Sequence, residues 1–554
     1  MAHRDGPLIE VPTARPAHSA IVGRLAVTAL GAAPLVFAAV MFGWPLVALA
    51  ERAFADGSAS NLWQLLDGAN AAHLLWFTVA QAAASTALTL LIGLPLAWVL
   101  STYELRGALL LRVLVTIPFV LPTVVVGVAF SALLGDRAPL AGLDLAASVW
   151  AILLAHMFFN VAVVVRTVGS VWSGIDPRSE QAARTLGAGP IRVFRTITLP
   201  ALAPAIASAA SVVFLFCATS FGVILILGGG RFNTLETEIY RQAIGFFQLP
   251  AAVALSMAQI VVVAVVVALS AILGRRVRAT AAPRYRRRPR GREWPVIGSI
   301  LGVSGVILLA PPAILVLRSV RPTVGGNWNL DGYRALSESV NGQTPLDTMR
   351  YSLLSATWAT VIAMALGLAG AVAISRARGW SGSAATVITM LPLGVSAVTV
   401  GLGYLVVLTA MPREVSTSPV IVPAVQALIA CPLVIRILVP AMGLIDRRLR
   451  QATATLGAGP LRVWWTVDFP VIRRALCAAA GFAFVIALGE FGATSFVARP
   501  DTTTVPVLIG SSLARPGSGN FATAMACSVM MLVVTAVVVT LIEVVRREER
   551  GGEF

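Results

Sequence analysis

Residues 175–200 read IDPRSEQAARTLGAGPIRVFRTITLP, and residues 445–470 read IDRRLRQATATLGAGPLRVWWTVDFP. The two stretches are 270 residues apart and share the hinge Leu-Gly-Ala-Gly-Pro, at 186–190 and 456–460. In each copy the aspartate is a preferred N-cap for a short helix, and the glycines end that helix. The proline after the hinge can start a second short helix, which we expect to stop at Pro200 in the first copy. Each stretch therefore predicts two short helices joined by a glycine hinge.

The rest of the chain is strongly apolar. Of its 554 residues, 57% are hydrophobic and 12% are charged, with a mean hydropathy of +0.85. Soluble globular proteins carry about 25% charged residues, so these values indicate a membrane protein. Twelve stretches are long enough to span a bilayer, near 23–50, 73–100, 108–134, 145–170, 203–227, 251–274, 295–320, 349–375, 384–411, 417–442, 474–498 and 520–545. The first is too long for a cleaved signal peptide and follows a polar segment.

The twelve candidate spans form two repeats of six. At the offset of 270, Phe221-Gly222 aligns with Phe491-Gly492, and earlier in each half an offset of 274 aligns Gly93 with Gly367. Six spans are an even number, so both repeats insert in the same direction and are related by an axis along the membrane normal. We therefore expect an all-α integral membrane protein with two parallel six-helix repeats and a pathway between them.

The arginines predict the orientation in the membrane. Cytoplasmic connections are enriched in arginine, and the run from Arg275 to Arg292, between spans six and seven, carries nine of them. The connections 51–72 and 135–144 carry acids and few bases, so we place both termini in the cytoplasm of a bacterial plasma membrane. The arginine run is interpreted as a topology-fixing linker, with nucleic-acid or anionic-lipid binding as the alternative. The expected organisation is a tail 1–22, a first unit 23–274, a linker 275–294, a second unit 295–546 and a tail 547–554.

The basic residues also exclude one class of enzyme. All 42 of them are arginine, so the chain cannot contain the lysine of a nucleotide-binding P-loop. We therefore expect no Walker-type ATPase site in this chain. The four cysteines lie within apolar stretches and form no CxxC pattern, so neither a disulfide framework nor a cysteine metal site is expected.

The hinge stretches resemble a known signature. Gln181-Ala182-Ala183, three residues, Gly187, nine residues, Ile197, one residue and Leu199-Pro200 look like the EAA motif of permease subunits of ATP-binding-cassette importers. The second copy keeps this spacing, with Gln451-Ala452-Thr453 followed by Gly457. It departs from the family pattern at Thr453, and both copies have glutamine where the family often has glutamate. The resemblance covers nearly the whole chain, as two fused permease units similar to ferric-iron and thiamine permeases.

The resemblance implies a type I importer fold and a division of labour between subunits. In that family the EAA helices are coupling helices that sit in a groove of separate ATPase subunits. The residues expected to couple to the ATPase are Gln181, Ala182, Ala183, Gly187, Gln451, Ala452, Thr453 and Gly457. The implied partners are two copies of an ATPase subunit, an extracytoplasmic solute-binding protein and the lipid bilayer, without nucleic acid. ATP and magnesium would lie on the partner subunits, and this chain would bind no cofactor or metal and perform no catalysis.

Fewer residues point to the transported solute. The stretch from Phe221 to Tyr240 resembles that of thiamine permeases, and less closely that of iron permeases, although its glycine trio is interpreted as a simple turn. Glu490 is the acid well inside an apolar span, and its aligned partner is Ser220. An intramembrane acid is a candidate for function, so these two residues are predicted to line a pathway for thiamine, with ferric iron as the second candidate. A structural ion pair is the alternative for Glu490.

Three other functional interpretations are weighed. His156 and Asn160 lie one helical turn apart, and we favour an interhelical hydrogen bond over a metal site. A self-powered secondary transporter with parallel repeats would need coupling-ion sites, for which Glu490 alone is a poor supply. A membrane-embedded enzyme is disfavoured because no HExxH or GxSxG motif is present.

Overall fold

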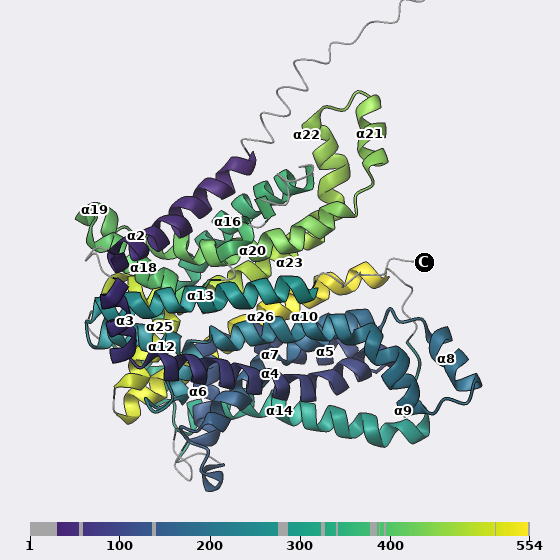
Figure 1. The fold of residues 1–554 in the computed structure, drawn as a ribbon, viewed down its shortest axis with the longest axis horizontal. Coiled ribbons are helices and arrows are strands. Elements are labelled where there is room, and N and C mark those ends of the chain that lie inside the picture. Colours follow the sequence, from purple (N-terminus) through teal and green to yellow (C-terminus); the bar gives the residue numbers. More distant parts are fainter. Residues whose placement is uncertain are drawn as a thin grey trace, which may run out of the picture.

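The computed structural model describes residues 30–551, except 55–58, 136–139, 275–285, 323–326, 340–341, 377–384, 387, 393–394 and 516. The described part is a bundle of helices without a named strand (Figure 1). Helices α2 to α13 are Trp44–Phe54, Ala59–Gly68, Ala71–Thr102, Ala108–Val120, Thr123–Leu134, Val149–Trp172, Pro177–Thr185, Pro190–Val193, Leu199–Ala218, Gly222–Leu227, Leu235–Tyr240 and Leu249–Gly274. Helices α14 to α16 are Trp294–Val320, Asp331–Arg334 and Pro345–Arg376; α18 to α26 are Ala397–Thr409, Arg413–Ser416, Ile421–Gly443, Arg447–Thr455, Pro460–Val463, Phe469–Gly489, Thr494–Val497, Val505–Ala514 and Ser518–Gly551.

The helices account for the expected spans. Ten helices in the described part are long and apolar enough to cross a membrane. An eleventh candidate, predicted near 108–134, is a pair of helices, α5 and α6, bent by 103°. The twelfth, predicted near 384–411, is described only in part and contains the apolar helix α18. The prediction of an all-α membrane protein with two six-helix repeats is confirmed.

One local expectation is wrong. Pro200 does not end the second short helix, because the helix runs without a break from Pro190 to Ala218. Residues Phe194–Thr198 form one π-helical turn just before the proline, closed by the Leu199 amide donating to the carbonyl of Phe194. Proline lacks an amide hydrogen and its ring crowds the preceding turn of an α-helix, whereas a π turn widens that turn. The second half repeats the arrangement, with a π turn at Trp464–Asp468 ahead of Pro470.

Equivalent contacts recur within each of the two halves. A Cβ placed on Gly93 of α4 would lie 2.8 Å from the Cβ of Val164, and one on Gly367 of α16 would lie 2.7 Å from that of Val434. Both glycines therefore allow the second and fourth long helices of their repeat to pack closely. The first turn of α12 is anchored by the Leu235 amide donating to Thr78 Oγ1 (3.2 Å). The aligned amide in the second half, that of Val505, donates to Ser352 Oγ (2.8 Å).

The first span of each half packs on the other half. Helix α2 contacts α18, where the hydroxyl of Tyr404 donates to the carbonyl of Met41 and a Cβ on Gly403 would meet Pro45. Helix α14 of the second half packs in the same way on α6 and α4 of the first half. The halves are therefore interlocked, and neither buries its own first span alone.

The described end of the arginine linker is fixed to the first half. The Arg287 amide donates to the carbonyl of Thr102 (3.1 Å), and the Glu104 amide donates to the carbonyl of Arg287 (2.9 Å). The Arg287 guanidinium lies 4.8 Å from the ring centroid of Tyr103 and forms an ion pair with Glu293. The linker thus holds the start of α14 against the end of α4. Residues 275–285 of the expected linker lie outside the described part of the chain.

Candidate functional site: the paired-helix segments and the seam between the halves

Each hinge stretch folds as one short helix, a glycine hinge and the first turn of the membrane helix that follows; we call α8–α9 and α21–α22 the paired-helix segments. Asp176 caps α8, with its Oδ1 accepting from the Arg178 amide at 2.9 Å. Asp446 caps α21 in the same way, with the Arg448 amide at 2.9 Å. A carboxylate N-cap occupies an amide that the first helical turn leaves without a partner. The predicted caps are therefore confirmed in both halves.

The hinge glycines adopt the same left-handed backbone. Gly187 has φ +83° and Gly457 has φ +81°. A Cβ on either residue would meet nothing within 4 Å. The requirement for glycine at both hinges is thus the positive φ, which costs other residues about 1–2 kcal/mol, and not crowding within this chain.

The predicted coupling residues have the same exposure in the two copies. Gln181 and Ala182 of α8 are exposed and Ala183 is half-buried; on α21, Gln451 and Ala452 are exposed and Thr453 is half-buried, and both hinge glycines are exposed. Large apolar side chains beside each hinge are also exposed. Leu186 and Leu456 are 88% and 87% exposed, and Ile191 and Leu461 are 74% and 76% exposed. Exposed apolar surface repeated at matching positions is typical of a docking surface.

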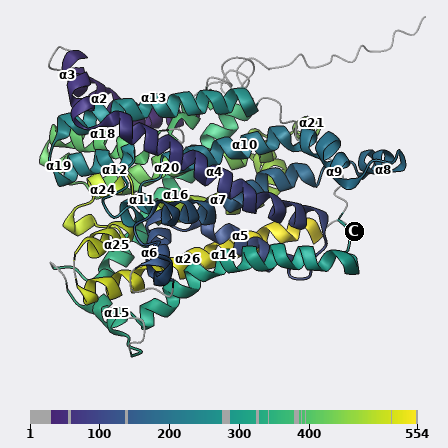
Figure 2. The ribbon, with the colours of Figure 1, turned by 60° about the horizontal axis from the view of Figure 1, so that its bottom comes forward.

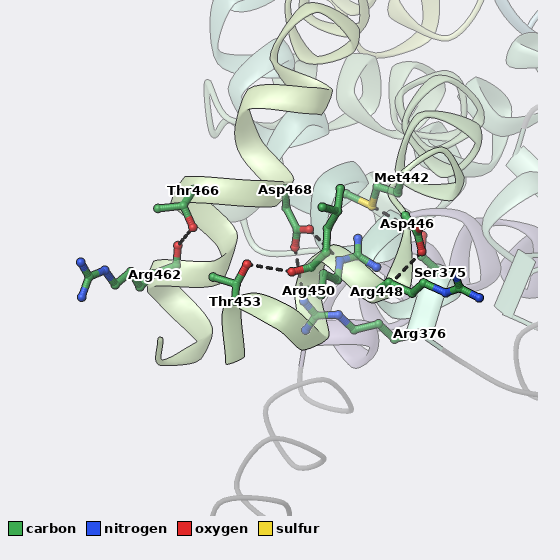
Figure 3. A network of polar contacts seen from close by, with 11 residues as sticks. Ser375, Arg376, Met442, Asp446, Arg448, Arg450, Thr453, Arg462, Thr466 and Asp468 are labelled. Atoms are coloured by element: carbon green, nitrogen blue, oxygen red, sulfur yellow. Dashed lines mark hydrogen bonds and ion pairs between the residues drawn. The ribbon is translucent and has the colours of Figure 1, made fainter. Parts of the chain in front are cut away.

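The two segments are braced by opposite chemistry at aligned positions. In the first half, Thr198 Oγ1 donates to Glu180 Oε1 (2.8 Å), which joins the π turn to α8. In the second half, Arg450 Nε donates to Asp468 Oδ1 (2.7 Å), and Arg376 lies 4.0 Å from the same carboxylate (Figure 3). The acid therefore lies on α8 in one half and on the π turn in the other. In both halves one polar pair fixes the first short helix to the membrane helix that follows.

Both paired-helix segments project from one end of the molecule. Figures 1 and 2 place α8, α9 and α21 at the end where the last helix, α26, also finishes. In Figure 1 the two segments stand well apart. A cavity of about 530 Å³ lies behind the first segment, lined by Gln181 and Arg184 of α8, by the end of α4 and by Arg287 of the linker. Helices α3, α12, α18 and α25 gather at the opposite end (Figure 2).

Aromatic side chains join the halves at that opposite end. The aligned residues Phe221 and Phe491 stack on each other, with ring centroids 5.0 Å apart and planes at 22°. Tyr240 of α12 contacts Phe221 edge-on (5.2 Å) and also Phe496 of the second half (5.6 Å). Aromatic pairs in these geometries contribute about 0.5–1.5 kcal/mol each beyond area burial. The rings therefore close the seam between the halves at this end.

The two residues predicted to line the pathway lie directly beside this aromatic contact. Ser220 and Glu490 immediately precede Phe221 and Phe491, and both are buried. The Glu490 carboxylate accepts from the Ala493 amide at Oε1 and from the Thr494 amide at Oε2, both at 2.8 Å. The carboxylate thus orders the turn that starts α24. The alternative weighed for Glu490 is a structural ion pair, whereas the partners seen here are backbone amides.

Helix α12 carries two buried acids that were not among the predicted residues, Glu236 and Glu238. Glu236 of α12 is fully buried; its Oε1 accepts from Gln259 Nε2 (2.9 Å), and its Oε2 accepts from the hydroxyl of Ser396 in the other half. It was missed because it follows a glycine trio in a short polar stretch that reads as an extracytoplasmic turn. The available signal was the repeat itself, since the position aligned with Glu236 is Pro506.

His156 and Asn160 take part in packing contacts. His156 Nδ1 lies 3.2 Å from Ser85 Oγ, which links α7 to α4. Asn160 Nδ2 donates to the His156 carbonyl (3.0 Å) and contacts Cys217 Sγ of α10 (3.5 Å). The expected interhelical hydrogen bond is therefore confirmed.

Comparison with known proteins identifies the class of this chain. Residues 90–279 match the family model of the binding-protein-dependent transport system inner membrane component. The molybdenum transport system permease protein ModB of Mycobacterium bovis is 35% identical over 243 residues, which is 90% of that protein and 42% of this chain. The chain therefore belongs to this family, and it is a multi-pass inner-membrane permease of an ATP-binding-cassette importer.

Relatives that match along most of the chain include two thiamine permeases. The thiamine transport system permease protein ThiP of Brucella abortus is 28% identical over 534 residues, covering 92% of each chain. The ThiP protein of Escherichia coli is 27% identical over 463 residues, covering 80% of this chain and 85% of its own. The fused two-unit architecture expected from the sequence is thus shared with these relatives.

Proposed function

We propose that this chain forms the pathway through which thiamine enters the cell, delivered by an extracytoplasmic binding protein and driven by two copies of a separate ATPase subunit. The observation that carries the ATPase part of the proposal is the duplicated paired-helix segment. Two hinges with matching φ, matching caps and matching exposed leucines offer two near-equivalent docking surfaces at one end of the molecule. Two surfaces of this kind in one chain fit a motor with two similar grooves.

The proposed coupling residues are those of the first short helix and hinge in each half. Gln181, Ala182, Ala183 and Gly187 in the first half, and Gln451, Ala452, Thr453 and Gly457 in the second, would contact the ATPase subunits. ATP and magnesium would bind to those subunits, so this chain needs no cofactor and makes or breaks no bond in the solute. With this end facing the ATPase, both termini would lie in the cytoplasm.

The arrangement of the two ends supports alternating access. The paired-helix segments stand apart, while the aromatic seam at the opposite end is closed. This is the arrangement expected of a pathway open to the cytoplasm. When ATP draws the two ATPase subunits together, the segments would approach and the seam beside Ser220 and Glu490 would open.

Thiamine is proposed as the solute because the permeases matched along 92% of the chain carry that name. Ferric iron is the second candidate from the sequence. ModB aligns with one unit only, so it supports the shared permease fold more than a shared solute.

The test is reconstitution of the full chain with its ATPase subunit and binding protein in proteoliposomes. We expect ATP-dependent accumulation of labelled thiamine, and binding of thiamine by the isolated binding protein in calorimetry. Binding of ferric iron or molybdate without thiamine would overturn the proposed solute. Accumulation driven by a proton or sodium gradient, with this chain alone, would favour the secondary transporter.

A further inference from the structure

We propose that Glu236 is the carboxylate that receives the positive charge of an organic cation when the seam between the halves opens. The inference rests on the proposed function and assigns the residue of the pathway that recognises the positive charge of the solute.

Three buried acids lie near the seam, and two of them have other partners. Glu238 pairs with Arg241 (3.2 Å) and accepts from Gln242 Nε2 (2.7 Å). Glu490 is held by two backbone amides of its own half. Glu236 accepts from two uncharged side chains, one in each half. Its carboxylate is therefore the one whose hydrogen bonds must change when the halves separate.

The scaffold does not require an acid at this position. The helix that follows the fifth span starts in the same way in both halves, anchored by Thr78 in one and Ser352 in the other. Yet the position aligned with Glu236 is Pro506, and the position aligned with Ser396 is Pro122. The same type of seam therefore forms once with a carboxylate–hydroxyl pair and once with prolines at the equivalent positions. Since a buried carboxylate is costly, its presence in one seam indicates a role beyond packing.

The surroundings of Glu236 suit an aromatic cation. Tyr240 lies one turn further along α12 and contacts Phe221 and Phe496. Aromatic faces attract organic cations, and a carboxylate adds the opposite charge. An oxyanion would be repelled by the same carboxylate. A hard metal ion prefers several oxygen ligands, and no group of three or more His, Cys, Asp or Glu suited to a metal occurs in the described residues.

Opening of the seam would exchange one partner of Glu236 for the solute. Ser396 caps α18, with its Oγ accepting from the amides of Val398 and Thr399, so it would move with α18. Gln259 lies on α13 of the same half as Glu236 and would stay. Separation of α12 from α18 would therefore free Oε2 of Glu236 toward the pathway, with Oε1 still held in place.

The test measures solute held by the opened pathway. The complete complex, with ATPase subunits and binding protein loaded with labelled thiamine, is trapped with ATP and vanadate and separated from free solute. We expect Glu236→Gln to lower the thiamine retained per complex roughly tenfold or more, the scale of a lost charged partner. Glutamine keeps the size of the side chain and can still bond Ser396 and Gln259, so the complex should assemble. Glu236→Asp, which keeps the charge, should retain more thiamine than Glu236→Gln.

Matched variants separate charge recognition from closure of the seam. Ser396→Ala removes the bond across the seam but keeps the carboxylate, and should retain thiamine like the wild type. Glu238→Gln, which removes the charge of the neighbouring buried acid on α12, should also retain it. Wild-type retention in Glu236→Gln, or an equal loss in Glu238→Gln, would overturn the inference. Failure of the wild-type binding protein to bind thiamine would instead overturn the proposed solute.

Discussion

At the scale of single residues, the chain uses the same position differently in its two halves. Glu180 and Thr198 align with Arg450 and Asp468, so that donor and acceptor change places while the brace is kept. The hinge glycines, in contrast, have nearly the same φ in both halves. The hinge thus needs a glycine with positive φ in both halves, whereas the polar pair beside it can differ as long as a donor meets an acceptor.

The hinge gives the first prediction. We expect the double variant Gly187→Asp and Gly457→Asp to insert and fold but to lose coupling. Each new side chain is strained at positive φ by about 1–2 kcal/mol and places a charge beside exposed leucines. The measurement is the substrate-stimulated ATPase activity of the reconstituted complex. The matched control is Gly291→Asp, which introduces the same charge outside the paired-helix segments. Normal stimulation in the double variant would contradict the coupling role.

Glu490 gives the second prediction. Replacing it by glutamine leaves one acceptor oxygen for two amides, which should loosen the turn that carries Phe491 and α24. We expect Glu490→Gln to reduce thiamine uptake while the complex still assembles. Uptake and the amount of purified complex are measured together. Normal uptake would remove Glu490 from the pathway, and failure of the protein to accumulate in the membrane would show a purely structural role.

At the scale of elements, the brace of the second segment can be tested by exchange. Asp468 is buried and hydrogen-bonded to Arg450. We expect Asp468→Asn to destabilise the segment by about 1.5–3 kcal/mol, the range for a hydrogen bond to a charged group. A lower melting temperature of the purified complex would show this loss.

The matched control installs the chemistry of the first half. The double variant Arg450→Glu and Asp468→Thr recreates the Glu180–Thr198 pair at the aligned positions. We expect it to recover part of the stability lost in Asp468→Asn. A double variant less stable than the single one would show that the two braces are not equivalent.

The sequence predicts most elements but not all of their neighbours. Hydropathy locates the spans, and the caps Asp176 and Asp446 locate the short helices, because both signals are local. The continuation through Pro200 depends on a π turn, which has no simple sequence signature. The exchange of first spans depends on which apolar faces meet, and hydropathy measures length rather than partners. Glu236 was missed for a related reason, since its side chain is held between α13 of its own half and α18 of the other half.

At the scale of the whole molecule, interlocking makes the two units one structure. Helix α2 packs on α18, α14 packs on α6, and the linker residue Arg287 bonds to the end of α4. Because these contacts are more extensive than those of each first span within its own half, we expect each first span to move with the opposite half when the halves move relative to each other.

The whole-molecule prediction concerns the motor. The chain has no lysine for a P-loop and carries two paired-helix segments, which we propose as docking sites. We expect the purified chain alone to show no ATPase activity and no uphill transport, and to gain both with one kind of ATPase subunit at two copies per chain plus the binding protein. Native mass of the complex gives the stoichiometry. A complex active with a single ATPase copy would contradict the equivalence of the two segments.

Because the first span packs on the other half, its packing partner is synthesised much later than the span itself. About 340 residues separate the end of α2 from the start of its partner α18. At roughly 5–20 residues per second, the ribosome needs on the order of 20–70 s to deliver that partner. During this interval the faces around Met41 and Pro45 have no α18 to cover them, although α13 of the same half, which also contacts α2, precedes α18 in the chain. We therefore expect the packing of the first span to remain incomplete in the membrane until α18 of the second unit has been synthesised.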